Sequence, residues 1–336
     1  AVEFLAVLHT LGFHLIYYSM QPHFYVQQNF LAWGGSWDPF FLLLSGFKLT
    51  CTRLSSATPS RAEPLGPFML RRFMRVYPLY LFTVLLKCAQ KLVYERAHPT
   101  QHLLFETTLD WAELPQNLVL WRNRYNGPAW FIRSILVQSF FWNLISPWLM
   151  TLSLPGCWCG LFCTLLTTYA RIFVWKACKP QMDLHLTQNS LVNFHMMLCG
   201  TFLARLSAAG GFRGMLPLTL LGRRVAFGGL TALVLLLGTL ASMSAVRERV
   251  PVKVGLLLPL HALLACSLAS SDDLLGQLCR RPQLRRLGAL AYALAIMQDA
   301  ACTVLRRHWL VQWQSFDLEA FCFAIVPGYV ALAAAC

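Results

Sequence analysis

Residues 37–50, WDPFFLLLSGFKLT, and residues 71–80, RRFMRVYPLY, decide the fold of this chain. The first stretch is an apolar run that contains one acid, Asp38, and the second joins three arginines to the start of another apolar run. A carboxylate inside an apolar span is costly and usually functional, and clustered arginines bind phosphates well. The two stretches indicate a membrane protein with a polar site in its interior and a phosphate site at one edge.

The composition agrees with this interpretation. Hydrophobic residues make up 57% of the 336 residues and charged residues only 12%, whereas soluble domains average about 45–50% and about 25%. The chain has room for about ten spans of about 20 residues. We predict an all-α fold, a polytopic transmembrane helix bundle of about ten spans, in a single domain over residues 1–336. The predicted spans are residues 1–20, 30–50, 76–93, 130–150, 156–175, 191–206, 225–245, 254–270, 287–305 and 320–336.

Basic loops set the predicted topology. Residues 51–75 carry five arginines and a single acid, so the positive-inside rule places them in the cytoplasm. Ten spans then place the basic residues of 280–286 and both termini inside as well, and leave Arg247, Arg249 and Lys253 outside. Residues 94–129 contain no run long enough to span, and we expect an extracytoplasmic loop with an interfacial or re-entrant helix. Because the chain begins inside an apolar run without a Met, we expect residues before Ala1 to be missing.

Charge and cysteine content exclude other classes. The net charge of +14 would suggest a nucleic-acid partner in a soluble protein, but the arginines lie in loops between apolar runs, and no basic patch is interleaved with aromatic residues. We therefore predict the lipid bilayer as a partner and no nucleic acid. No paired Cys-x-x-Cys is present, and no metal is predicted. Most of the 12 cysteines lie in apolar runs, which is typical of buried free thiols.

His14 and Asp38 are the candidate catalytic residues. If the first two spans are antiparallel neighbours, the depths of these residues differ by only a few ångströms at about 1.5 Å per residue. A histidine beside a carboxylate is the usual arrangement of a general base, and the alternative is a polar contact that locks two helices together. Glu3 and Lys48 are matched in the same way near the inner ends and are interpreted as a structural ion pair.

Arg71, Arg72 and Arg75 are the candidate phosphate-binding residues. Arg72 and Arg75 are three positions apart and share one face of a helix, so the pair can clamp a phosphate or a diphosphate. The alternative is ordinary positive-inside anchoring or contact with lipid headgroups. The remaining polar residues of the spans are interpreted as packing or helix-linking groups: His9, Ser45, Arg133, His195, Arg205 and Asp299.

These blocks, in this order, resemble the acyltransferase-3 family of multi-pass membrane O-acyltransferases. EFLAVLHTLGFH at 3–14 places His14 at the family's histidine, GGSWDPFFLLLSGF at 34–47 matches the block with Asp38, and RRFMRVYPLY contains the family's Arg-x-x-Arg at Arg72 and Arg75. Weaker matches are GPAWFIRS at 127–134, MLCGTFLARL at 197–206 and LGALAYALAIMQDA at 287–300. Two positions depart from the pattern, because Glu3 stands where a basic residue is usual and Gln298 where a His is common.

The resemblance implies a membrane O-acyltransferase. Its donor would be a cytoplasmic acyl-CoA, with acetyl-CoA expected, whose phosphates Arg72 and Arg75 would hold with Arg71 in reserve. His14, oriented by Asp38, would take the proton of a hydroxyl on a carbohydrate or lipid acceptor. Two alternatives stay open. A transporter or flippase would use the intramembrane polar residues as a path, although no inverted repeat is visible. A catalytically inactive membrane scaffold would explain the changes at Glu3 and Gln298.

Overall fold

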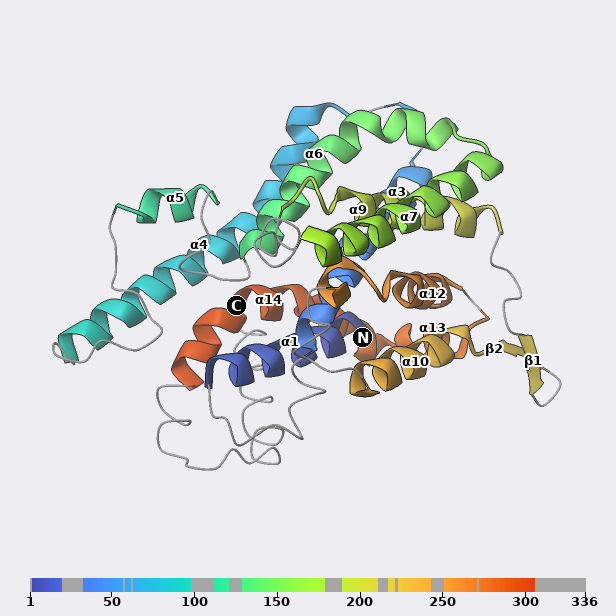
Figure 1. Ribbon diagram of the computed structural model, residues 1–336. Helices are drawn as coiled ribbons and strands as arrows, with labels where there is room; N and C mark the ends of the chain where they lie inside the picture. The colour runs from blue at the N-terminus through green and yellow to red at the C-terminus, as the bar shows by residue number, and fades with distance from the viewer. Residues whose placement is uncertain are drawn as a thin grey trace. The chain divides into compact units, whose positions relative to one another are not determined.

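The computed structural model describes residues 2–19, 33–56, 58–61, 63–97, 112–120, 129–178, 189–210, 217–220, 223–242, 251–270 and 272–305. The regular secondary structure of these residues is helical apart from one short hairpin (Figure 1). They form two units. The first unit comprises residues 1–2, 35–70 and 134–286, and the second comprises residues 3–34, 71–133 and 287–336.

The first unit is built mainly from helices that pack along α9 (Phe194–Ala208). Its helices are long apolar segments interrupted by Gly, Pro and Asn, which end a helix or favour a turn. Its other elements are η2 (Gly34–Trp37), α3 (Asp38–Leu54), the start of α4 (Leu65–Ala97), α6 (Ala129–Thr151), α7 (Leu154–Cys178), β1 (Pro217–Leu220), β2 (Arg223–Ala226), α10 (Gly228–Ser242), α12 (Leu258–Ala269) and α13 (Leu274–Cys279).

Two glycines bring the backbones of α3 and α9 into contact. A Cβ atom added at Gly46 would collide with the carbonyl oxygen of Met197, and one added at Gly200 would collide with the carbonyl oxygen of Leu43. Small residues that allow such close approach are typical of helix pairs in membranes, where packing rather than the hydrophobic effect drives association. The helix-packing role predicted for the Ser45–Gly46 segment agrees with the position of Gly46 at this crossing.

Contacts at two levels join α7 to α9. The ring of His195 lies 3.3 Å from Arg171 Nη1 and 3.0 Å from Thr168 Oγ1. A Cβ atom added at Gly160, more than two turns earlier in α7, would meet the ring of Phe202, later in α9. The two helices are therefore antiparallel, and they lie side by side in Figure 1. His195 is a helix-linking residue, as predicted.

Another set of hydrogen bonds joins α6 to α9. The indole nitrogen of Trp142 donates to Thr201 Oγ1 over 3.0 Å. Further along both helices, the guanidinium of Arg205 donates to the backbone carbonyl of Leu149 over 3.0 Å, and also to those of Met150 and Leu152. Arg205 therefore caps the carboxyl end of α6, which confirms its predicted linking role. The order of these contacts makes α6 and α9 parallel.

A two-stranded hairpin departs from the predicted all-α fold. β1 pairs with β2 in antiparallel register, from Pro217 opposite Ala226 to Leu220 opposite Arg223. Ala226 also bridges to Asp273, whose buried carboxylate accepts from the backbone N–H groups of Gly229, Leu275 and Gly276. The acid satisfies orphan N–H groups at the starts of α10 and α13. The predicted span at 225–245 is correspondingly shorter, because α10 begins only at Gly228.

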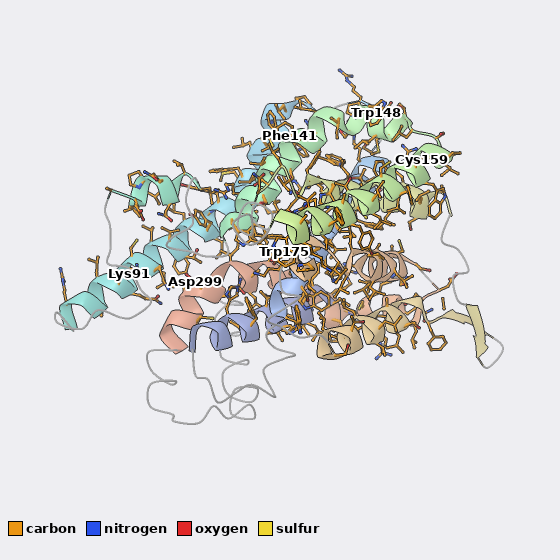
Figure 2. The ribbon with its side chains drawn as sticks, in the orientation of Figure 1. Lys91, Phe141, Trp148, Cys159, Trp175 and Asp299 are labelled. Carbon is orange, nitrogen blue, oxygen red and sulfur yellow. The ribbon has the colours of Figure 1, made fainter. Side chains whose placement is uncertain are left out.

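The second unit contains most of α1 (Val2–Ser19) and α4, with α5 (Leu114–Leu118) and α14 (Pro282–Leu305). Lys87 Nζ of α4 lies 3.5 Å from Asp299 Oδ2 of α14; the lysine is buried and the aspartate mostly buried. Three residues further along α4, Gln90 Nε2 donates to the carbonyl of Ala300 over 3.4 Å. The two helices are therefore parallel, and Asp299 links them as predicted. Figure 2 labels Asp299 and Lys91, a buried lysine one turn beyond Lys87.

The short helix α5 contacts the inner half of α4. Tyr77 Oη donates to the carbonyl of Leu118 over 3.1 Å, and Tyr80 Oη donates to the carbonyl of Asn117. Both tyrosines precede Val93, the predicted outer end of this span, by 13 residues or more, or about 20 Å of helix. Irregular backbone lies at such depth only where protein satisfies its polar groups. Of the two predicted forms of this loop, the contacts favour the re-entrant helix.

The surface of the first unit is strongly apolar. Large side chains of α6 and α7 are exposed, among them Trp148 (Figure 2) at 62%, Phe162 at 66% and Phe173 at 74%. By length and composition, two helices of the described residues can cross a membrane, Leu65–Val93 and Leu154–Ala177. Shorter apolar helices cover Val2–His14, Gly228–Leu240 and Leu258–Ala269. Fewer helices meet this test than the number of spans predicted.

Two more of the predicted spans differ in their bounds from the observed helices. The run at 30–50 is not one helix, because residues 34–37 form a 3-10 turn and α3 begins at Asp38. The run at 76–93 is part of α4, which begins at Leu65 and has 33 residues. The predicted span at 320–336, together with Arg247 and Arg249, lies outside the described residues. The described cysteines are free. Cys163, which was predicted to be buried, is exposed, and so are Cys51 and Cys159.

Candidate functional site

The predicted phosphate-binding arginines lie on the amino-terminal half of α4. This helix has 33 residues and is therefore about 50 Å long. The hydrocarbon core of a bilayer is only about 30 Å thick. The helix can therefore carry Arg71, Arg72 and Arg75 at or beyond the membrane edge. Arg71 and Arg75 are exposed, whereas Arg72 is half-buried. Arg72 lies within electrostatic range of both other guanidinium groups, so the cluster repels itself.

Tyr292 of α14 lies beside this cluster. Its hydroxyl interacts electrostatically with Arg75 and is buried without a hydrogen-bond partner among the described residues. Tyr292 belongs to the weaker match at 287–300, and the sequence did not indicate that it lies near the arginines. The second unit thus brings the predicted arginines together with a phenol that retains its hydrogen-bonding capacity.

Asp38 is the first residue of α3. The preceding Gly34 and Gly35 disfavour a helix, and Pro39 suits the first helical turn because it lacks an N–H group that would need a partner there. A carboxylate at this position is stabilised by the helix dipole. Lys253, from the helical turn at 251–254, interacts electrostatically with Asp38, and its side chain lies against Gly35. The sequence placed Lys253 in an outer loop and did not identify it as a partner of Asp38.

His261 lies against the turn that carries Asp38. Its ring centroid is 5.7 Å from that of Trp37 and 5.5 Å from that of Phe40. The side chain is fully buried, and neither ring nitrogen has a hydrogen-bond partner among the described residues. A lone histidine in an apolar run cannot be told from a packing residue by sequence, so no signal in 254–270 indicated this position.

His14 lies in α1, in the second unit, and its ring is half-exposed and packs edge-on against Phe13. Asp38 belongs to the first unit, so the predicted His14–Asp38 pair stays a prediction. The same division leaves the Glu3–Lys48 pair a prediction. His9, which was interpreted as a packing residue, is buried, and Arg133 is half-buried in α6.

Two further observations bear on the candidate chemistry. In the part of the chain that the structure describes, no group of three or more His, Cys, Asp or Glu side chains is arranged to hold a metal ion. Gln298, at the position where the family often has a His, is buried, and its Oε1 has no hydrogen-bond partner among the described residues. A buried amide at this position keeps a polar group in place of the imidazole but has no basic nitrogen.

Helices with exposed apolar faces, a buried ion pair and an arginine cluster near one end of a long helix are typical of membrane proteins. The acyltransferase domain of the acyltransferase-3 family matches residues 2–332. The chain belongs to this family, whose members are polytopic membrane proteins, and it is an acyltransferase that acts on an acyl donor and an acceptor. No curated protein and no solved structure matches the chain significantly.

Proposed function

We propose that this protein transfers an acyl group, expected to be acetyl, from a cytoplasmic acyl-CoA to a hydroxyl of a carbohydrate or lipid acceptor. One acyltransferase domain over residues 1–336 crosses the membrane about ten times. Arg72 and Arg75 hold the phosphates of the donor, with Arg71 in reserve, and the acyl-bearing arm enters the chamber between the spans.

His14 serves as the general base and Asp38 as its orienting acid. The imidazole takes the proton of the acceptor hydroxyl while the oxygen attacks the thioester carbonyl carbon. The carbon–sulfur bond then breaks, and the coenzyme A thiolate takes the proton from the imidazolium. Lys253 interacts electrostatically with Asp38, the first residue of α3.

The arginine cluster is the observation that carries the proposal. Three guanidinium groups within five residues of α4 repel one another, and an anion with several charges relieves this repulsion better than a single carboxylate does. Arg75 is exposed and therefore open to a donor that arrives from the cytoplasm. Bidentate contacts between arginine and phosphate give such a site both affinity and orientation.

Helix directions support the ten-span topology. Alternation predicts that 156–175 and 191–206 run in opposite directions, and α7 and α9 are antiparallel. It predicts equal directions for 130–150 and 191–206, and α6 and α9 are parallel. It also predicts equal directions for 76–93 and 287–305, and α4 and α14 are parallel.

The test uses membranes that contain the full chain and acetyl-CoA labelled in its acetyl group. Label transferred to acceptor or released by thioester hydrolysis is measured for the wild type, His14→Gln and Arg75→Ala. We expect loss of turnover in His14→Gln at any donor concentration, because removal of a general base costs about 10²–10⁴-fold. Arg75→Ala should raise the KM for acetyl-CoA with a smaller effect on kcat, because it weakens binding of a remote group.

Two matched variants control for damage to the helices. His9→Gln changes a buried histidine of the same helix α1, and Arg96→Ala removes an exposed arginine at the other end of α4. Both should retain turnover per folded molecule. Undiminished turnover in His14→Gln would exclude His14 as the general base. An unchanged KM for acetyl-CoA in Arg75→Ala would exclude Arg75 as part of the donor-binding site.

A further inference from the structure

His261 is an isolated polar group in an apolar environment. It lies in the first unit, on α12, between the rings of Trp37 and Phe40, and none of its surface is exposed. Both ring nitrogens are without a hydrogen-bond partner in the described residues. In contrast, His195 of the same unit makes hydrogen bonds with both nitrogens, to Val192 O and Thr168 Oγ1.

An enclosed imidazole without partners is unfavourable. Buried polar groups in native proteins are almost always hydrogen-bonded, and each exception calls for an explanation. A phenylalanine would fill the same space between two aromatic rings without that cost. The free donor and acceptor of His261 therefore point to a partner that arrives during function. Because Trp37 and Phe40 flank Asp38 along the chain, that partner arrives next to the acid that the proposed function assigns to the reaction.

The environment favours a hydrogen-bond donor over a base. A base must become an imidazolium, and a buried cation is costly without a counter-charge. Neither nitrogen of His261 is bonded to a carboxylate, and the electrostatic partner of Asp38 is already Lys253. A neutral imidazole that donates its N–H needs no change of charge. Such a donor is most valuable where negative charge develops in a dry site.

We propose that His261 donates its ring N–H to the oxyanion that forms when the acceptor hydroxyl attacks the thioester; this role rests on the proposed acyl transfer. The hydroxyl oxygen bonds to the carbonyl carbon, the carbonyl electron pair moves to oxygen, and His14 takes the hydroxyl proton. The oxyanion accepts the hydrogen bond from His261. Collapse re-forms the carbonyl, expels the thiolate and lets it take the proton from His14, so His261 gains and loses no proton.

The thioester reaches the imidazole when the ring of Trp37 or Phe40 turns aside. Side-chain rotamer changes of this kind are common when a ligand binds. The donor arm is apolar at its acyl end, so it can replace the aromatic ring without leaving apolar surface uncovered. The site therefore stays dry while the hydrogen bond forms.

The experiment compares His261→Phe and His261→Gln with the wild type in membranes that contain the full chain. His261→Phe keeps an aromatic ring but has no N–H, so we expect kcat to fall about 10²–10³-fold with KM little changed. His261→Gln keeps an N–H donor and should recover part of this loss. The pH dependence of kcat should keep the same shape in both variants, since the base is unchanged. His195→Phe is the structural control, which should reduce the folded amount but not kcat per folded molecule.

A second measurement does not need turnover. A thioether analogue of acetyl-CoA without a carbonyl should bind the wild type and His261→Phe equally. An analogue with a tetrahedral oxyanion should bind His261→Phe at least tenfold more weakly. Equal binding of the oxyanion analogue, unchanged kcat in His261→Phe, or loss of one limb of the pH profile would overturn the oxyanion role while the proposed function stands. If the wild type binds neither analogue and transfers no acetyl group, the proposed function and this inference both fail.

Discussion

Among single residues, Asp38 and Lys253 offer the most direct test of whether a charge interaction stabilises the polar interior. Lys253 is the charged side chain that interacts with Asp38. We expect Lys253→Met to lower the unfolding temperature, because it removes the positive charge that interacts with the Asp38 carboxylate, and Asp38→Asn completes the cycle. The double variant should be more stable than the sum of the single effects predicts, with a coupling of about 0.5–3 kcal/mol.

Thermal unfolding in detergent, followed by tryptophan fluorescence, measures all four members of this cycle. Lys176→Met removes an exposed lysine near the end of α7 and should change little. Additive effects of the two single variants would mean that Lys253 does not stabilise Asp38.

Sequence reasoning identified residues whose partners are close in sequence. The spacing of Arg72 and Arg75 predicted one helical face, and both lie on α4 with Arg72 within range of both other arginines. It missed Lys253 and His261, which lie more than 200 residues from the turn that they contact. No local pattern in an apolar run reveals such a partner, because any residue of another span can occupy that place.

At the level of elements, the crossing of α3 and α9 depends on two glycines. Gly46→Ala should destabilise the protein by at least about 1–3 kcal/mol, because the new methyl group meets the backbone of Met197, which cannot rotate away as a side chain can. Gly238→Ala of α10 is the matched control, since nothing lies within 4 Å of its Cβ position. The control should be neutral or stabilising by about 0.5–1 kcal/mol. Unfolding in a denaturing detergent gives both values, and equal stability of the two variants would contradict the close crossing.

The parallel pair α4 and α14 depends on a buried ion pair. Lys87→Met removes the positive charge that faces the mostly buried carboxylate of Asp299, and we expect a loss of stability of up to about 3–5 kcal/mol. Exchange of the two charges, with Lys87→Asp and Asp299→Lys in one chain, should recover part of this loss. Retained activity and unfolding temperature report the recovery. An exchanged chain no more stable than Lys87→Met would show that the pair does not join the helices.

The type of most elements was predictable, but several bounds were not. Apolar runs predicted α6, α7 and α9 nearly at their observed positions. The run at 30–50 concealed a break, because Gly34 and Gly35 favour a turn more strongly than the surrounding apolar residues favour a helix. The hairpin at 217–226 escaped prediction because Asp273, a distant residue, bonds to the segment that follows it.

At the scale of the whole molecule, the number of spans follows from which loops share a side of the membrane. Six predicted spans separate residue 61 from residue 285, so both positions should be cytoplasmic, and residue 249 should be outside. The variants Arg61→Cys, Arg249→Cys and Arg285→Cys can report this after the exposed thiols Cys51, Cys159 and Cys163 are replaced by serine.

A membrane-impermeant maleimide added to sealed vesicles of known orientation should label Arg61→Cys and Arg285→Cys from the cytoplasmic face only. Arg249→Cys should react only from the opposite face, and detergent should make all three reactive, which controls for access to each thiol.

The re-entrant position of α5 against Tyr77 and Tyr80 makes this outcome the expected one. A segment that enters and leaves on the same side adds no crossing, so the count between residues 61 and 285 stays even. Labelling of Arg61→Cys and Arg285→Cys from opposite faces would require an odd count. Residues 94–129 would then contain a complete span, or one of the short apolar helices would not cross the membrane.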